Sequence, residues 1–495
     1  MAALAAPRWS LNHKIRMFRK LILAIICACT IIPAQAQLPK REFRGAWLHT
    51  VYQDQYLRNS TERNKEYLRN QLDSLRTAGV NTVIFQVRPQ ADAFYESSLE
   101  PWSCYLTRNG AAPSPYWDPL QFMIDECHAR GMELHAWLNP YRVTAGAKQQ
   151  PCASHIYHKH PERFLRYDGK LYFDPALPEN RRHIEKVVED IVERYDVDGI
   201  HFDDYFYPYP VKGKEFPDDA SYKKYGGGQD RGDWRRANVD KLISGIHDVI
   251  ARSSRPWVRF GISPFGIWRN ESSDPRGSKT SGLQNYDGLY ADVLLWARNG
   301  WIDYLLPQLY WELDHKAAGY RTLIHWWARN AEGRHMYIGQ DVGRTMKKNE
   351  LDEKLALQRS HPEIQGMCWW PGYSVTRNEG GVADSLAMVH QRSRALVPSY
   401  PWIESAGAPA VKGLKLDGET LSWTAPAPQG AVSDAVRFVV YRFDEADDCD
   451  ITDASAIVEV TPRNHFLAVV PGYYVVTALD RVNNESAPSR AVRVK

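Results

Sequence analysis

The sequence lacks the charge excess that would indicate a polyanionic partner. Its 495 residues contain 62 Lys+Arg and 59 Asp+Glu, and five of the basic residues, but no acidic one, fall within positions 1–36. The rest of the chain has 57 basic and 59 acidic residues, a balance near −2. We therefore expect no nucleic-acid partner. A hydrophobic content of 44% with 24% charged residues excludes a mostly disordered chain and a multispan membrane protein.

Cysteine is also scarce, and no CxxC pair or metal-ligand spacing occurs among the seven. Five remain after residue 36: Cys104, Cys127, Cys152, Cys368 and Cys449. This odd number leaves at least one free or intermolecular thiol, although one disulfide within the first three fits the spacing. Because His-Glu-x-x-His is absent too, we expect neither a metal nor another cofactor.

Two further signatures are missing. Gly226-Gly227-Gly228 is not followed by Gly-Lys-Ser/Thr, which excludes a P-loop there. No Gly-x-Ser-x-Gly elbow is present, which argues against a serine hydrolase. An enzyme that hydrolyses amide bonds would thus have neither its usual nucleophile nor a metal.

The N-terminus is typical of an export signal. Lys14, Arg16, Arg19 and Lys20 precede the apolar run 21–32, which at 12 residues is too short to span a bilayer. Ala34-Gln35-Ala36 then offers a cleavage site. We predict a signal peptide over 1–36 and a periplasmic or secreted protein with no membrane span after cleavage. An uncleaved anchor and a lipid anchor on Cys29 are the alternatives.

From residue 42 to residue 396 the chain alternates strand-like and helix-like segments, which predicts an α/β fold of the (β/α)8 TIM-barrel type. An open doubly wound sheet is the rival, but the first strand leads into no Gly-rich phosphate turn. The predicted strands cover 44–51, 82–88, 133–141, 199–206, 259–265, 303–311, 336–340 and 365–370. The predicted helices include 61–78, 119–130, 179–195, 234–252, 351–360 and 384–395.

The pattern changes after residue 396. Prolines mark a linker over 397–410, and residues 411–495 show short strands with almost no helical period. We predict a small all-β sandwich. Trp423 and Tyr473-Tyr474 resemble the core pattern of a fibronectin type III domain. We also expect the barrel to fold without this module.

The strongest chemical signal ends the fourth strand. In a (β/α)8 barrel the active site lies at the C-terminal ends of the strands. Asp203 and Asp204 end this strand among aromatic residues, and burying a carboxylate is costly unless it has a function or a partner. Strand alternation places Asp203 on the inward face with His201. If the alternation of inward and outward side chains is shifted by one residue, Asp204 would take the place of Asp203.

A second carboxylate is expected across the barrel mouth. Glu312 follows the sixth strand and shares a face with Gln308 and Tyr310. Two facing carboxylates are what glycoside hydrolysis needs. We assign Asp203 as nucleophile or stabiliser and Glu312 as general acid, with the roles exchangeable. Asp341 and Glu271 are the reserve candidates, and retention of configuration is the expected outcome.

Aromatic residues favour a sugar substrate, because 14 of the 17 tryptophans fall between Trp47 and Trp370. Flat rings with a polar edge suit the apolar faces of pyranose rings. The tryptophans expected near strand ends are Trp137, Trp268, Trp311, Trp369 and Trp370. Trp137 shares one face of the third strand with three further candidates for substrate binding: His135, Asn139 and Tyr141.

At this point the sequence resembles the bacterial glycosyl-hydrolase-like family ten. The matching stretches are Phe43–Trp47, Gln86–Tyr95, Pro101–Ser103, Leu134–Arg142, Asp198–Pro208, Ile262–Asn270 and Pro307–Trp311. The resemblance implies an exported (β/α)8 glycosidase. One member of the family cleaves peptidoglycan strands that have lost their stem peptides. From the same stretches, Arg88, Asp92, Trp102, Arg142, Tyr205 and Arg269 are further candidates for contacts with the glycan.

The expected protein is therefore a monomeric, exported glycoside hydrolase whose partner is a cell-envelope glycan. Two alternatives stay open. One is a glycan-binding barrel without catalytic activity, which would not need both carboxylates. The other is a glycosidase that acts on a dietary or host polysaccharide.

Overall fold

The computed structural model describes residues 38–495, of which Pro39–Lys495 form one compact unit. The predicted signal peptide and Cys29 lie outside the described residues. Within those residues, no helix combines the length and the apolar content that crossing a bilayer requires.

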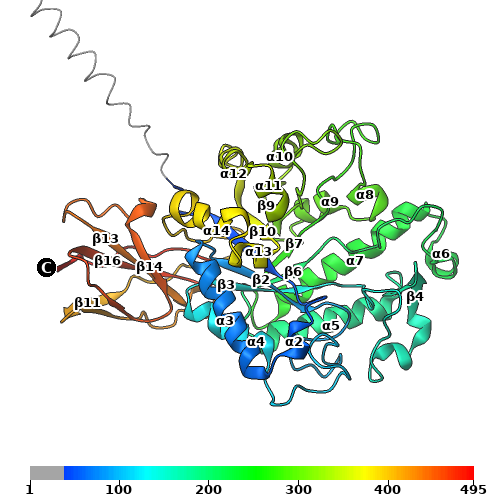
Figure 1. The fold of residues 1–495 in the computed structure, drawn as a ribbon, viewed down its shortest axis with the longest axis horizontal. Helices are drawn as coiled ribbons and strands as arrows, with labels where there is room; N and C mark the ends of the chain where they lie inside the picture. Colours follow the sequence, from blue (N-terminus) through cyan, green and yellow to red (C-terminus); the bar gives the residue numbers. More distant parts are fainter. Residues whose placement is uncertain (1–37) are drawn as a thin grey trace, which may run out of the picture. The chain divides into compact units, whose positions relative to one another are not determined.

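Eight parallel strands close into a barrel in the order β1-β10-β9-β8-β7-β6-β3-β2, which confirms the predicted architecture (Figure 1). The strands are β1 (Phe43–Leu48), β2 (Thr82–Arg88), β3 (Glu133–Leu138), β6 (Gly199–Phe202), β7 (Arg259–Ile262), β8 (Tyr304–Leu305), β9 (His335–Asp341) and β10 (Ile364–Trp370). Several end earlier than predicted, because the chain leaves the ladder to form the loops of the barrel mouth.

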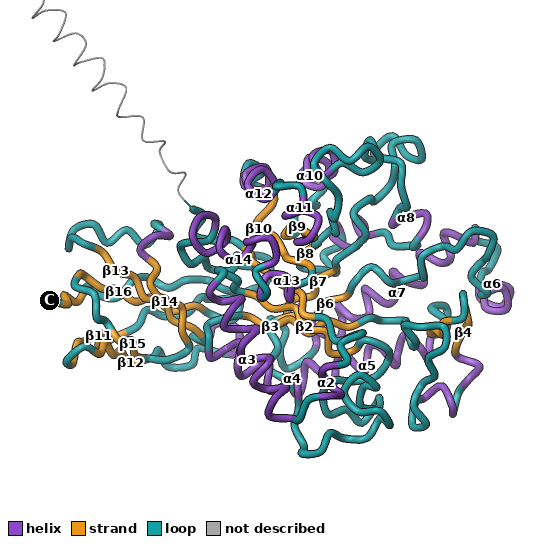
Figure 2. Tube along the Cα trace, viewed as in Figure 1, coloured by secondary structure: helices purple, strands orange, loops and turns teal. Residues whose placement is uncertain are grey.

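Helices surround the barrel, as the purple segments of Figure 2 show. The longer ones are α3 (Thr61–Thr77), α4 (Pro119–Ala129), α5 (Pro178–Arg194), α7 (Arg231–Arg252), α10 (Tyr320–Ala328) and α12 (Leu351–Arg359). The short ones are α2 (Gln55–Arg58), α6 (Asp219–Tyr225), α8 (Asn285–Gly288), α9 (Val293–Arg298), α11 (Val342–Lys347), α13 (Gly372–Thr376) and α14 (Val382–Ser385). Short helical turns are η1 (Ile156–His158), η2 (Pro161–Arg163), η3 (Glu379–Gly381) and η4 (Leu386–His390).

The helix predicted over 384–395 is wrong beyond His390, where the helical turns stop. The carbonyl oxygens that follow are used by the start of the barrel instead. Arg44 Nη1 donates to Ser393 O at 2.6 Å, and the amide of Glu42 donates to Leu396 O at 2.9 Å.

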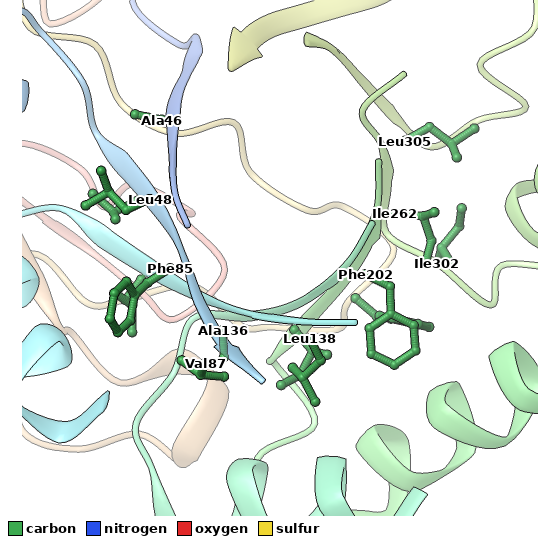
Figure 3. Packing of buried hydrophobic residues seen from close by; sticks show 14 of the residues in the cluster. Ala46, Leu48, Phe85, Val87, Ala136, Leu138, Phe202, Ile262, Ile302 and Leu305 are labelled. Atoms are coloured by element: carbon green, nitrogen blue, oxygen red, sulfur yellow. The ribbon is translucent and has the colours of Figure 1, made fainter. Parts of the chain in front are cut away.

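Alternation along the strands separates two buried layers. Outward side chains such as Leu48, Phe85, Phe202 and Ile262 pack against the helices, and Figure 3 shows them on the convex side of the curved strands. Inward side chains fill the barrel with large rings. Gly261 is required there, because a Cβ atom at this position would lie 1.8 Å from the ring of Tyr304.

Residues beyond 410 form two antiparallel sheets, one ordered β11-β12-β15 and the other β14-β13-β16-β17. The strands are β11 (Lys412–Asp417), β12 (Thr420–Thr424), β13 (Arg437–Phe443), β14 (Ile457–Thr461), β15 (His465–Leu467), β16 (Gly472–Leu479) and β17 (Val492–Val494), with turns η5 (Ala431–Ser433) and η6 (Ala454–Ala456). The remaining strands, β4 (Phe164–Tyr167) and β5 (Lys170–Phe173), form a hairpin in the loop after β3.

The two sheets contact the end of the barrel where the strands begin. Glu133, the first residue of β3, is fully buried and pairs with Arg259 at 2.6 Å and with Arg437 of β13 at 2.9 Å. Asn483 Nδ2 also donates to this carboxylate, at 3.0 Å. Buried ion pairs across this contact argue against the separate folding of the barrel that the linker suggested.

The five described cysteines are all free thiols. Cys104 and Cys152 line one small cavity, whereas Cys127 and Cys368 are fully buried elsewhere.

Candidate active site

A cavity of about 390 Å³ opens at the C-terminal ends of the barrel strands. Its lining comes from the ends of β1, β2, β3 and β10 and from the loops after β1, β3, β6, β7 and β8. The lining residues are Trp47, His49, Val51, Tyr52, Gln86, Trp137, Arg142, Asp203, Asp204, Tyr205, Tyr209, Ser263, Gln308, Tyr310 and Trp370.

Asp203 follows β6 directly and is held by donors on both of its oxygens. Trp137 Nε1 donates to Oδ2 at 3.2 Å, and Asn139 Nδ2 lies 3.0–3.1 Å from both oxygens. Burial raises the pKa of Asp203, while the positive charge of Arg142 and the two donors act in the opposite direction. The result is a carboxylate fixed in one orientation.

Asp204 is equally buried but has a different environment. Burial and the neighbouring charge of Asp203 raise the pKa of Asp204 to about 7. The hydroxyl of Tyr209 donates to Oδ2 of Asp204. A carboxyl group with this pKa can carry a proton near neutral pH, as a general acid must.

Aromatic rings form one wall of the cavity, which we call the aromatic wall: Trp47, Trp137, Tyr310 and Trp370. The ring of Trp370 lies edge-on to those of Trp47 and Trp137, with centroid distances of 6.4 and 6.1 Å. Tyr310 lies edge-on to Trp47 at 6.5 Å. Such a wall offers flat apolar surface to a sugar ring.

The loop after β6 contributes Tyr205 and Tyr209 to the cavity lining. Tyr205 and Tyr209 stack at 5.3 Å, and the guanidinium of Arg142 lies 5.1 Å from the ring of Tyr205. Arg142 itself is anchored because its Nε and Nη2 donate to Pro89 O at 3.1 and 3.0 Å.

A chain of hydrogen bonds leads from the aromatic wall into the barrel. Trp47 Nε1 can only donate, so His201 Nε2, at 3.2 Å, must accept. Burial lowers the pKa of His201 well below its usual value, so its one proton lies on Nδ1 and is donated to Tyr304 Oη at 2.9 Å. The Tyr304 hydroxyl then donates to His135 Nδ1 at 2.9 Å, and His135 Nε2 donates to Glu133 at 3.3 Å. We call this series the interior chain.

The interior chain corrects the expectation for His135 and His201. Both side chains are fully buried, and neither lines the cavity, because each uses both ring nitrogens within the barrel. His201 contacts the aromatic wall through Trp47, and His135 lies deeper in the barrel, between Tyr304 and Glu133.

The structure brings together about half of the residues predicted for the site. Asp203, Asp204, Trp137, Arg142, Tyr205, Gln308, Tyr310 and Trp370 line the cavity. Asn139 supports Asp203 from behind.

Glu312, expected as the general acid, is not among the lining residues. Its carboxylate pairs with Lys348 at 3.2 Å, and 40% of its side chain is exposed. The reserve candidates are placed elsewhere too: Asp341 caps α11 by accepting from the amide of Arg344 at 2.7 Å, and Glu271 is exposed. The expectation of a carboxylate facing Asp203 across the mouth is therefore corrected.

Other predicted binding residues serve the fold instead. Arg88 pairs with buried Glu100 at 2.6 Å, and Arg269 pairs with Asp274 and Asp287. Trp268 stacks on Trp326 at 5.7 Å. The remaining ones, which also lie outside the cavity, are Asp92, Trp102, Tyr141, Trp311 and Trp369.

Sequence reasoning missed seven lining residues: Trp47, His49, Val51, Tyr52, Gln86, Tyr209 and Ser263. Trp47 and Gln86 lie near the ends of β1 and β2. They could have been predicted as lining residues, because the alternation of side chains along each strand places both on the inward face. Gln86 Oε1 accepts from the amides of Thr50 and Val51, each at 3.0 Å, and so shapes the loop that carries Val51 and Tyr52.

Across residues 38–495, no group of three or more His, Cys, Asp or Glu side chains could hold a metal ion.

Comparisons with known proteins identify the family of the chain. The model of the family described as glycosyl hydrolase-like 10 matches residues 42–356. The chain belongs to the glycosyl hydrolase-like 10 family. It is 35% identical to glycosyl hydrolase YngK of Bacillus subtilis over 502 residues, which cover 96% of this chain and 98% of that protein.

Glycosyl hydrolase DigH of Escherichia coli is another relative, 36% identical over 414 residues, covering 72% of this chain and 93% of DigH. Among solved structures, the glycoside hydrolase domain of PgaB from Bordetella bronchiseptica superposes with a TM-score of 0.50 at 12% identity. That match covers 70% of this chain and 99% of the domain, and it shows a shared fold.

Proposed function

We propose that the protein is an exported glycoside hydrolase that cleaves a cell-envelope glycan, namely peptidoglycan strands that lack stem peptides. The observation that carries the proposal is the pair Asp203 and Asp204, both buried in a cavity that has an aromatic wall. A barrel that only bound glycan would gain nothing from two adjacent buried carboxyl groups, whose desolvation is costly.

The two carboxyl groups have separate tasks in this proposal. Asp204 protonates the oxygen of the leaving sugar, since its pKa of about 7 allows it to hold a proton at neutral pH. Asp203 acts as an ionised group that stabilises positive charge as the glycosidic bond breaks. Asp204 thus takes the role that the sequence assigned to Glu312.

The substrate assignment is tested by incubating the mature protein with intact and with amidase-treated peptidoglycan and by measuring the mass of the released fragments. We expect sugar fragments from the amidase-treated strands only. Binding without release of fragments would support a glycan-binding barrel without catalytic activity. Cleavage of a dietary or host polysaccharide alone would support a glycosidase that acts on such a polysaccharide.

Export is a separate proposal, based on the basic residues, apolar run and Ala-x-Ala site of residues 1–36. N-terminal sequencing of the protein from its native envelope should give Gln37 as the first residue. A start at a lipidated Cys29 would contradict cleavage after Ala36.

For the C-terminal sheets we propose a fibronectin type III-like sandwich. Trp423 of β12 and Phe438 of β13, which belong to different sheets, share one buried cluster and meet edge-on at 5.5 Å. This is the packing expected when two sheets cover a common core.

A further inference from the structure

We propose that the nucleophile in this site belongs to the substrate: the 2-acetamido group of the sugar attacks its own anomeric carbon while Asp203 holds that group and Asp204 handles the proton. The inference rests on the proposed glycosidase function. It adds a nucleophile that the 2-acetamido-2-deoxy sugar itself supplies and a role for Asp203 that differs from direct attack.

The first argument is the absence of a facing carboxylate among the described lining residues. Glycosidases that use two protein carboxyl groups place them on opposite sides of the scissile bond, about 5–5.5 Å apart for retention and about 6.5–9.5 Å for inversion. Here the only acidic lining residues are Asp203 and Asp204. They are neighbours in the chain, so both approach the sugar from the β6 side.

The second argument is how Asp203 is held. Both of its oxygens accept hydrogen bonds from Trp137 or Asn139, and the amide of Tyr205 adds a longer contact of 3.4 Å to Oδ1. These donors fix the group and reduce its power as a nucleophile. Because the Asn139 amide nitrogen is shared between both oxygens and the Tyr205 contact is long, the carboxylate can accept a hydrogen bond from one more donor. The N–H of an acetamido group is such a donor, and it becomes positively charged when the amide oxygen attacks.

The third argument is the surface beside Asp203. Trp137, whose indole N–H binds this carboxylate, belongs to the aromatic wall with Trp47 and Trp370. An acetamido group bound through its N–H to Asp203 would place its methyl group near this apolar surface. Burying that methyl group favours an N-acetylated sugar over one with a hydroxyl or free amine at the same position.

The chemical step balances without any further reactant. Asp204 gives its proton to the glycosidic oxygen, the bond from that oxygen to the anomeric carbon breaks, and the acetamido oxygen bonds to the anomeric carbon. The product is a cyclic oxazolinium ion beside the Asp203 carboxylate. Water then attacks the anomeric carbon and gives a proton to Asp204, the bond to the acetamido oxygen breaks, and the amide is restored. Two inversions at one carbon give net retention.

The test compares two acyl groups on otherwise identical strands. Amidase-treated peptidoglycan is de-N-acetylated, and one half is re-acetylated while the other receives trifluoroacetyl groups. Fluorine withdraws electrons from the amide oxygen, so the mature wild-type protein should cleave the trifluoroacetyl strands more than about tenfold more slowly. A disaccharide thiazoline, a stable mimic of the cyclic ion, should inhibit at least about 100-fold more tightly than the parent disaccharide.

The outcomes separate the two proposals. Equal rates on both acyl strands with no thiazoline inhibition would overturn this inference and leave the glycosidase function standing. Failure to cleave even the re-acetylated strands would overturn the proposed function itself.

A variant tests the role of Asp203. D203N should lower kcat roughly 100-fold, because a preorganised charge at the developing cation is lost. Removing that charge also lowers the pKa of Asp204, so the fall in activity toward high pH should begin at lower pH than in the wild type. Exposed Asp314, which pairs with Arg321 at 3.0 Å, provides the matched control D314N with unchanged rate and profile. A D203N protein that is folded by circular dichroism but keeps both the wild-type kcat and the wild-type profile would refute the assignment.

Discussion

D204N should lower kcat/KM on amidase-treated peptidoglycan by about 10²- to 10⁴-fold, the usual effect of removing a general acid. Asparagine keeps the shape of the side chain but cannot supply a proton to the leaving oxygen. Because the pKa of Asp204 is about 7, wild-type activity should fall as the pH rises above neutrality, where the carboxyl group loses its proton. Rates of fragment release between pH 5 and pH 9 check both statements.

The comparison with E312Q is informative, because the sequence pattern favours Glu312 as the acid. Glu312 pairs with Lys348 outside the cavity, so this variant should keep nearly the full wild-type rate. A silent D204N together with an inactive E312Q would restore the arrangement expected from sequence.

R437A should lower the free energy of unfolding by about 3–5 kcal/mol, the range measured when one partner of a buried ion pair is removed. Arg437 reaches from β13 to the fully buried Glu133, and its loss leaves that carboxylate with Arg259, Asn483 and His135. Urea unfolding of the mature protein, followed by far-UV circular dichroism, measures the change.

A matched surface variant is R442A, whose partner Asp444 is 82% exposed. It should change the free energy of unfolding by less than about 1 kcal/mol. If R437A lowered the free energy of unfolding as little as R442A, the contact between the barrel and the two sheets would not contribute to stability as argued. A chain that ends near residue 397 should be less stable than R437A, since it loses Asn483 as well.

The sequence was informative for some of the residues that lie within a strand or directly after one. Asp203 follows the last residue of β6, so alternation and the barrel rule place it correctly. Glu312 lies seven residues beyond β8, which has only Tyr304 and Leu305 in the ladder. In the loop between β8 and Glu312, side chains do not alternate as they do in a strand, so alternation cannot predict the direction of Glu312. That loop directs Glu312 toward Lys348.

Contacts between distant segments could not be predicted. Nothing in the local pattern around Trp268 or Arg269 distinguishes a binding residue from one that packs on Trp326 or pairs with Asp287. The contact of Arg437 with Glu133 is equally hidden, because 304 residues separate the partners. Such contacts depend on how loops and domains meet in three dimensions.

The interior chain has a consequence for how this protein can evolve by recombination. Every proton along it is donated in the same direction, from Trp47 to Glu133, and the charge at its end is matched by Arg437 of the C-terminal sheets. A gene fusion that exchanged the C-terminal module would remove Arg437 and leave Glu133 with Arg259 as its remaining cation. Successful exchanges should therefore carry a compensating change at position 133.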